Sequence, residues 1–194
     1  MFNLSPDHIS FNKIARLSKQ TIITEKIDGT NGVIYIDSDN FLVGSRNRWL
    51  DEHNENYGFY KWAQENKKEL MKLGSGWHYG EWWGNGIQRG YAKKKGDRVF
   101  SLFNVKNWKR GVDKYYPFET AQECPACCEV VPILKVLDIF DTSDIENELS
   151  YLKMFGSSAS PGFMDPEGVV IYHTASKTYF KKFIKDDFTA KEDK

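Results

Sequence analysis

The residues best suited to chemistry lie in one segment of this chain, Lys26-Ile27-Asp28-Gly29-Thr30-Asn31-Gly32. The segment places a lysine at the end of an apolar run typical of a β-strand, and a glycine-containing turn follows directly. A lysine amine held there can attack a nucleotide phosphate once it has lost its proton. An ordinary hairpin that carries a surface lysine is the alternative interpretation of the same residues.

The elements that must position this lysine are short strands and two helices. We expect strands on both sides of the turn, over 21–27 and 33–37. Further strands are predicted over 41–45, 77–82, 98–105, 133–140, 168–173 and 178–184. Apolar spacing predicts a helix over 56–73, and a capping box that begins at Ser143 predicts a second helix. This order predicts one α+β domain with antiparallel β-sheets and flanking helices.

Length and composition are those of one folded domain. With 194 residues, the chain is long enough to bury a hydrophobic core but too short for two large domains. The formal net charge is zero, so only local basic and aromatic stretches, such as 93–110 and 177–185, are candidates for nucleic-acid contact. The chain has no apolar run of membrane-spanning length and no signal-peptide pattern at its N-terminus. We therefore expect a cytoplasmic protein without a membrane partner.

The three cysteines lie together at Cys124, Cys127 and Cys128. Their odd number, in a chain without a signal peptide, indicates reduced thiols. The Cys-x-x-Cys spacing supplies half of a zinc site, but no second Cys or His pair lies nearby in the sequence. Thiols that pack or join a loop are the simpler interpretation.

Five separated motifs resemble those of the adenylyltransferase domain of ATP-dependent RNA ligases, most closely the nick-sealing phage type and its bacterial relatives. The motifs are Glu25-Lys26-Ile27-Asp28-Gly29-Thr30-Asn31-Gly32, Val43-Gly44-Ser45-Arg46-Asn47-Arg48, Tyr79-Gly80-Glu81-Trp82-Trp83, Phe100-Ser101-Leu102-Phe103-Asn104-Val105, and Glu167-Gly168-Val169-Val170 with Tyr179-Phe180-Lys181-Lys182-Phe183-Ile184-Lys185. The similarity covers nearly all of 21–187. It implies an ATP-grasp-like nucleotidyltransferase domain of the lysine nucleotidyltransferase superfamily.

The resemblance implies a covalent mechanism in which Lys26 attacks the α-phosphorus of ATP and expels pyrophosphate. The resulting lysyl-AMP passes its AMP to a 5′-phosphate end, and a 3′-hydroxyl then attacks that end and releases AMP. Glu25 and Ile27 are implied to border the nucleotide together with the lysine. Asn31 is implied to support the ribose region or the later joining step.

Two further motifs supply groups for the sugar, the base and the strand end. The resemblance implies that Arg46, with Arg48 as second choice, contacts the sugar or the 5′-phosphate, where a planar guanidinium suits phosphate oxygens. Glu81 is implied to hold the ribose hydroxyls or a metal-bound water. Phe103, with Phe100 as the alternative, is implied to stack on adenine. Without the resemblance, the arginine is a surface residue at a strand end and either phenylalanine is a core residue.

The last motif is implied to handle the metal and the triphosphate. Glu167 is expected to bind Mg²⁺ or Mn²⁺, directly or through water. The lysines after it, Lys181, Lys182 and Lys185, are expected to neutralise the triphosphate and to lower the pKa of Lys26. Neighbours on one strand point to opposite faces, so only one of the first two lysines can enter the site. The flanking acidic residues favour Lys181.

The domain is expected over 1–188, with a frayed tail over 189–194. Most polynucleotide ligases carry a second domain after this core, so an accessory protein is an expected partner besides nucleic acid, whether RNA ends, a nicked duplex or DNA. The first interpretation is an ATP-dependent RNA ligase that seals 5′-phosphate and 3′-hydroxyl ends. A minimal DNA ligase, another AMP-transferring nucleotidyltransferase and a non-catalytic nucleic-acid-binding relative are the alternatives.

Overall fold

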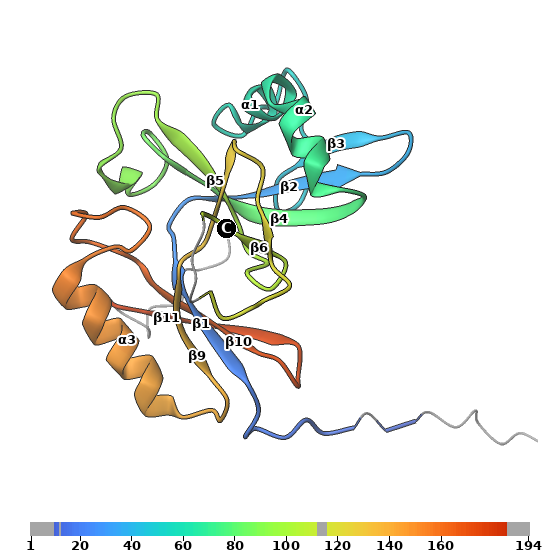
Figure 1. Cartoon of the computed structure of the whole chain (residues 1–194). Helices are drawn as coiled ribbons and strands as arrows, with labels where there is room; N and C mark the ends of the chain where they lie inside the picture. The colour runs from blue at the N-terminus through green and yellow to red at the C-terminus, as the bar shows by residue number, and fades with distance from the viewer. Residues whose placement is uncertain (1–9, 12, 112–115, 186–194) are drawn as a thin grey trace, which may run out of the picture.

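Two β-sheets organise the chain in the computed structural model, which describes residues 10–11, 13–111 and 116–185 (Figure 1). The first sheet has the strand order β11-β10-β1-β9, and the second has the order β3-β2-β4-β5-β8. The strands are β1 (Thr21–Lys26), β2 (Thr30–Ile36), β3 (Phe41–Gly44), β4 (Gly76–Gly84), β5 (Arg98–Leu102), β6 (Trp108–Lys109), β7 (Gln122–Glu123), β8 (Cys128–Val130), β9 (Ile133–Leu137), β10 (Gly168–His173) and β11 (Thr178–Phe183).

The chain passes from one sheet to the other at the lysine turn. β1 ends in the first sheet at Lys26, and β2 begins in the second sheet at Thr30. Successive side chains of a strand point to opposite faces. In β1, Ile22 accordingly packs in the cluster between the two sheets, and Ile23 packs in the cluster under a helix. The lysine turn is therefore built where the two sheets meet.

Helices cover the outer faces of both sheets. Helix α3 (Thr142–Phe155) packs on the first sheet, where Leu149 and Leu152 are buried against Val169 and Ile171 of β10. The helices α1 (Phe59–Glu65) and α2 (Lys67–Leu70) lie over the second sheet, at the opposite end of the molecule from α3 (Figure 1). These layers confirm the predicted α+β class with flanking helices.

The sheets are mainly antiparallel, as predicted, but two strand pairs are parallel. β8 joins the edge of the second sheet parallel to β5, and the short strands β6 and β7 pair parallel to each other. Both pairs involve the segment that leads to and from the cysteine cluster. No helix in the described part of the chain has the length and apolar character that crossing a bilayer requires. The predicted tail over 189–194 lies outside the described residues.

The helix predicted over 56–73 is shorter and broken. Asn56 and Tyr57 have positive φ angles of 48° and 56°, so α1 begins only after the left-handed Gly58. A break at Asn66 separates α1 from α2, and a 3₁₀ turn, η1 (Met71–Leu73), follows. At the break, both the backbone N–H and the side-chain amide of Asn66 donate to the Trp62 carbonyl, and the backbone of Asn66 leaves the helical region with φ −101° and ψ 11°.

The second helix begins two residues earlier than the capping box predicts. Asp141, not Ser143, is the N-cap of α3, and its carboxylate accepts a hydrogen bond from the Ser143 backbone N–H at 2.8 Å. A carboxylate at this position also interacts favourably with the positive end of the helix dipole.

A substitution of Phe100 tests the core of the second sheet, because this ring projects from β5 and is fully buried against α1. The ring lies 5.0 Å from Phe59 and 5.8 Å from Trp62, measured between centroids. We predict that Phe100→Ala lowers the free energy of unfolding by about 3–5 kcal/mol, measured by urea denaturation. The control is Phe180→Ala, whose ring is exposed on β11 and whose loss should cost about 0.5 kcal/mol or less. Equal effects of the two changes would contradict this packing.

Candidate functional site

Lys26 and Glu167 form an ion pair where β1 meets β10. The Lys26 Nζ lies 2.5 Å from Glu167 Oε2. Strand pairing explains the contact, because Lys26 lies opposite Gly168, the residue that directly follows Glu167. The lysine side chain is 22% exposed and the glutamate side chain only 6%, so the lysine is partly accessible to solvent and the carboxylate is enclosed. The Phe183 ring lies 5.7 Å from the same nitrogen.

The turn after the lysine is held from the 84–96 loop. The Asp28 carboxylate lies 2.9 Å from Arg89 Nε, and its backbone N–H donates to the Tyr91 hydroxyl at 2.9 Å. Ile27 is buried in the cluster between the sheets. A Cβ on Gly29 would come within 2.5 Å of the Trp82 carbonyl oxygen, so only glycine fits there. The turn is therefore fixed by contacts with the neighbouring loop and strand.

Glu81 faces the lysine turn from the second sheet. Its Oε1 accepts from the Gly29 backbone N–H at 3.0 Å, and its Oε2 accepts from the Asn31 side-chain amide at 3.3 Å. Burial raises the pKa of Glu81 to about 7; the positive charge of Lys26 opposes this, and the charge of Glu167 adds to it. Glu81, Lys26 and Glu167 thus form one electrostatic unit, and Asn31 is part of the same contact.

Glu25 lies on the opposite face of β1 from the lysine. Its Oε2 accepts from the backbone N–H groups of Ser158 and Ala159 at 2.8 and 2.9 Å, while its buried Oε1 has no hydrogen-bond partner in the described part of the chain. Burial raises the pKa of this carboxyl, although these hydrogen bonds oppose the shift. Its side chain clamps the loop after α3, and the structure does not bring it to the Lys26 nitrogen.

The two phenylalanines of the fourth motif lie on different faces. The Phe103 backbone N–H donates to the Tyr79 carbonyl, which continues the β4–β5 pairing by one row. Phe103 therefore shares a face with Tyr79 and Glu81, and it is half-buried against the cluster between the sheets. Phe100 is buried on the other face against α1. Only Phe103 is placed where a base near Glu81 could be reached.

The three lysines of the last motif go to three different places. Lys181 shares the Lys26 face, because both nitrogens approach the Phe183 ring, at 5.2 and 5.7 Å. Lys182 lies on the other face and pairs with Glu146 of α3. Lys185 lies 2.5 Å from Asp165, and this hydrogen bond lowers the pKa of the aspartate.

Arg46 and Arg48 lie in the exposed turn after β3. Both line a hollow of about 300 Å³ on the second sheet. Among the described residues, neither takes part in an ion pair with an acidic side chain. The structure therefore leaves both guanidinium groups available at the surface and does not bring them into contact with Lys26.

Two residues that build the site, Tyr91 and Arg89, lie outside the five sequence motifs and were not predicted. Tyr91 is fully buried, donates its hydroxyl toward the Lys26 carbonyl at 3.5 Å, and has a pKa raised by burial. Arg89 joins the lysine turn to the 165–167 segment through Asp28 and Asp165. The sequence signal for this link was the aspartate of Lys-x-Asp-Gly, which needs a cationic partner when it is partly buried. The 84–96 loop thus supports the turn.

The carboxylates around Lys26 fit a metal that arrives with a nucleotide. Mg²⁺ and Mn²⁺ favour oxygen ligands, and Mg²⁺ is commonly held by one or two carboxylates together with phosphate oxygens and water. Glu167 and Glu81 supply such carboxylates on both sides of the lysine. Within the described ranges, no group of three or more His, Cys, Asp and Glu side chains could hold a metal alone. This finding applies equally to the cysteine cluster, where a zinc site was the alternative.

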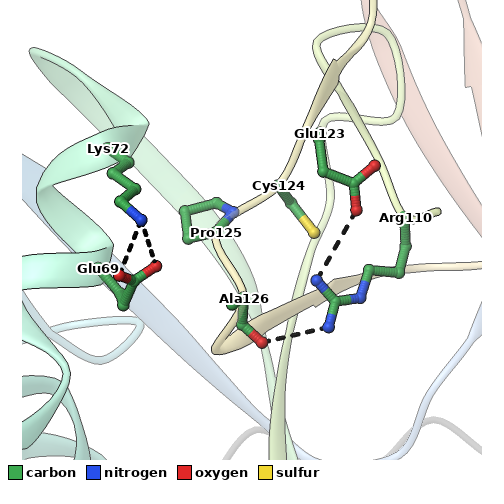
Figure 2. A pocket seen from close by; sticks show the side chains of 7 residues that line it. All are labelled: Glu69, Lys72, Arg110, Glu123, Cys124, Pro125 and Ala126. Carbon is green, nitrogen blue, oxygen red and sulfur yellow. Dashed lines mark hydrogen bonds and ion pairs between the residues drawn. The ribbon is translucent and has the colours of Figure 1, made fainter. Parts of the chain in front are cut away.

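A hollow of about 440 Å³ lies beside α2, and Figure 2 shows the residues that line it. Two charge pairs line it: Lys72 lies 2.8 Å from Glu69, and Arg110 lies 3.8 Å from Glu123. Burial raises the pKa of the Cys124 thiol at its wall to about 11, so this cysteine is protonated at neutral pH. None of the lining residues belongs to the five motifs.

Solved structures with the same fold include RNA ligase from Naegleria gruberi. Its complex with PPi matches with a TM-score of 0.59 and 24% identity, over 92% of this chain and 57% of that chain. A mutant with AMP and Mn matches with a TM-score of 0.58 at 24% identity and the same coverage. A mutant with ATP and Mn matches with a TM-score of 0.56 at 22% identity, over 86% of this chain and 49% of that chain. This chain therefore spans about half of their length.

A family model identifies the chain more directly. No curated protein sequence gave a significant match. The model of the RNA ligase family matches residues 19–189, which include all five motifs and both sheets. The site around Lys26 lies inside this match, between strands that the motifs themselves form. The chain belongs to the RNA ligase family.

Proposed function

We propose that this chain is the nucleotidyltransferase domain of an ATP-dependent RNA ligase, and that Lys26 is its nucleophile. One observation carries the proposal: the partly exposed Lys26 side chain lies where the two sheets meet, is paired with Glu167, and is close enough to Glu81 for its charge to act on that carboxyl. The family match over 19–189 and the ATP, AMP and PPi complexes of the Naegleria ligase support it. The domain is proposed to cover 1–188 and to act in the cytoplasm, in RNA repair.

In the first step, the Lys26 nitrogen bonds to the α-phosphorus of ATP, and the bond from that phosphorus to pyrophosphate breaks. The nitrogen can attack only after its proton has left and its ion pair with Glu167 has opened. A divalent cation bound with the triphosphate supplies charge neutralisation for the leaving pyrophosphate, and Glu167 is the carboxylate that would hold it. Lys181 is proposed to face the phosphates, since it shares the Lys26 face.

Recognition of the nucleotide is assigned to the second sheet. Phe103 is proposed to stack on adenine, and Glu81 with Asn31 to hold the ribose, because these side chains share one face beside the lysine turn. Ile27 shapes the floor of the site from the core. Glu25 contributes by holding the loop after α3 behind the lysine.

In the second and third steps, AMP moves from the lysine to a 5′-phosphate of RNA, and a 3′-hydroxyl then displaces it. Arg46 is proposed to contact the 5′-phosphate, with Arg48 beside it, because both guanidinium groups are exposed at the end of β3. This chain spans only about half of the length of the Naegleria RNA ligase that it matches. We propose that an accessory protein takes part in clamping the RNA.

Transfer of labelled AMP to the protein tests this function. With α-labelled ATP and Mg²⁺, we predict a labelled band near 22.5 kDa on a denaturing gel, and its loss below detection in Lys26→Ala and Lys26→Arg. Lys61→Ala, on the exposed surface of α1, is the matched control and should label like the unmodified chain. GTP and NAD serve as alternative donors.

Absence of label with every donor would contradict the proposal. Sealing of matched RNA and DNA nicks, followed on the same protein, identifies the strands that are joined. Preferential sealing of DNA would replace RNA as the substrate while leaving the first step intact.

The pH dependence of stability tests the enclosed state of Glu81. An unfolded carboxyl titrates near 4.5 and the folded Glu81 near 7, so between these values the unfolded state binds fewer protons and the stability of the fold falls as pH rises. The contribution of Glu81 to the free energy of unfolding is fully present below pH 4.5 and is lost as the pH rises through 7. Glu81→Gln stays neutral and should lack this loss.

We predict that the unmodified chain loses up to roughly 3 kcal/mol relative to Glu81→Gln between pH 4.5 and pH 8, measured by urea denaturation. Glu65→Gln, at an exposed position of α1, is the control for removing a carboxylate elsewhere. A constant difference between the unmodified chain and Glu81→Gln across this range would show that Glu81 is solvated like a surface carboxyl.

A further inference from the structure

A row of exposed aromatic side chains leads along the second sheet to the site. On β4, Trp77, Tyr79 and Glu81 occupy every second position, so their side chains share one face. On the neighbouring strand β2, Tyr35 lies opposite Trp77, and Val33 lies opposite Tyr79. Along β4 from Glu81 toward Trp77, the side chains on this face thus change from a carboxylate to aromatic rings.

The rings of this row stack on each other and remain open to solvent. Trp77 and Tyr79 lie 6.1 Å apart between centroids with their planes only 8° apart, and Trp49 stacks on Trp77 at 5.6 Å. About half of each residue is exposed: 53% for Trp77, 51% for Tyr79 and 47% for Trp49. A contiguous group of exposed rings of this kind marks an interaction surface. Gly44 leaves room for the Trp49 ring, because a Cβ at this position would come 3.0 Å from it.

The same surface carries positive charge. The hollow of about 300 Å³ beneath the row is lined by Trp49, Trp77 and Tyr79 together with Arg46 and Arg48, and no acidic side chain lines it. Guanidinium groups bind phosphate oxygens in a planar, forked geometry. Flat rings and two available arginines complement unpaired bases joined by phosphates, whereas they offer no anionic partner for a basic protein.

We propose that the aromatic row, Tyr35, Trp49, Trp77 and Tyr79, binds a single-stranded segment of RNA next to the end that is to be joined. Bases stack on the rings, and Arg46 and Arg48 contact the phosphates. At about 3.4 Å per residue, Trp77 lies roughly 13 Å along β4 from Glu81, a reach of a few nucleotides. This inference rests on the proposed function, because it assigns the RNA-binding surface beside the same site.

The position of the row explains why it is exposed. In the described part of the chain, the end of the second sheet where β4 begins and β2 turns into β3 points away from the strands of the first sheet (Figure 1), and Trp77 and Tyr79 on β4 are about half exposed. Near Glu81 the two sheets approach each other and bury Trp83 and Ile22 between them. An RNA strand that lies on the row is therefore directed toward Glu81 and the lysine turn.

Affinity for a short, 5′-phosphorylated single-stranded RNA tests the proposal, measured by fluorescence anisotropy at fixed salt. The double variant Trp77→Leu/Tyr79→Leu should raise the Kd about 10- to 100-fold, since each base stacked on an aromatic ring contributes substantially to binding. Trp77→Phe keeps a ring and should restore most of the affinity lost in Trp77→Leu. Replacing both Arg46 and Arg48 by Gln should lower the slope of log Kd against log salt by about two, because about two phosphate contacts are lost.

The matched control is Tyr151→Leu/Phe155→Leu. These rings form an exposed aromatic pair on α3, with centroids 4.9 Å apart, and lie away from the row. Circular dichroism and urea denaturation of every variant establish that it is folded, and the comparison of Trp77→Phe with Trp77→Leu isolates stacking from packing. Unchanged RNA affinity in the row variants, or an equal loss in the α3 control, overturns the proposal. So does a dimer of the chain that the row variants convert to monomer.

Lysyl-AMP formation, followed separately with labelled ATP, distinguishes the two proposals. Row variants that form lysyl-AMP normally but bind RNA weakly support both. A chain that binds RNA through the row yet forms no lysyl-AMP contradicts the proposed function and supports the RNA surface. A chain that forms lysyl-AMP and binds RNA independently of the row overturns only the surface.

Discussion

The ion pair between Lys26 and Glu167 is the contact on which the rest of the site depends. Its two partners are distant in sequence and meet only because β1 and β10 pair in a register that places Gly168 opposite the lysine. A partly enclosed charge that loses its partner typically costs about 3–5 kcal/mol, so this register is strongly favoured over a slipped one. The close approach of β11 to Gly168, where a Cβ would collide with the Lys182 carbonyl, extends the same constraint to the edge strand. The position of Lys26 is consequently determined by how β1, β10 and β11 pair.

The second sheet adds a rigid frame around this pair. Asp28 is held by Arg89, Gly29 by the Glu81 carboxylate, and both links cross from β1 to segments of the other sheet. Tyr91 closes the frame from inside the core. A nucleophile that is positioned by such contacts before substrate arrives needs little further ordering to reach a phosphorus atom. If a triphosphate binds here as proposed, its negative charge would be compensated by Lys181 on the Lys26 face and by a divalent cation that Glu167 would hold.

Local sequence signals predicted most of the elements and several residue placements. Alternation along the strands correctly separated Lys181 from Lys182, and the strand–turn–strand pattern around Lys26 was confirmed. The break at Asn66 and the Asp141 cap were missed, because both involve local side-chain hydrogen bonds to the backbone that apolar spacing does not reveal. The same alternation places Glu25 and Lys26 on opposite faces of β1, but the loop that Glu25 contacts, more than 130 positions later, could not be predicted from the sequence. Such contacts, like the buried Tyr91 and the aromatic row, exist only through tertiary packing of distant segments.

The most direct measurement of the central claim is the location of the covalent adduct. After incubation with ATP and Mg²⁺, the protein is digested and its peptides are sequenced by mass spectrometry under conditions that preserve phosphoramide bonds. We predict that AMP is found on Lys26 alone, because this partly exposed lysine lies where the two sheets meet, while Lys182 and Lys185 are paired with acidic residues elsewhere. An adduct on Lys181 or any other lysine, or an unmodified protein with all donors, would contradict the assignment of Lys26 as the nucleophile.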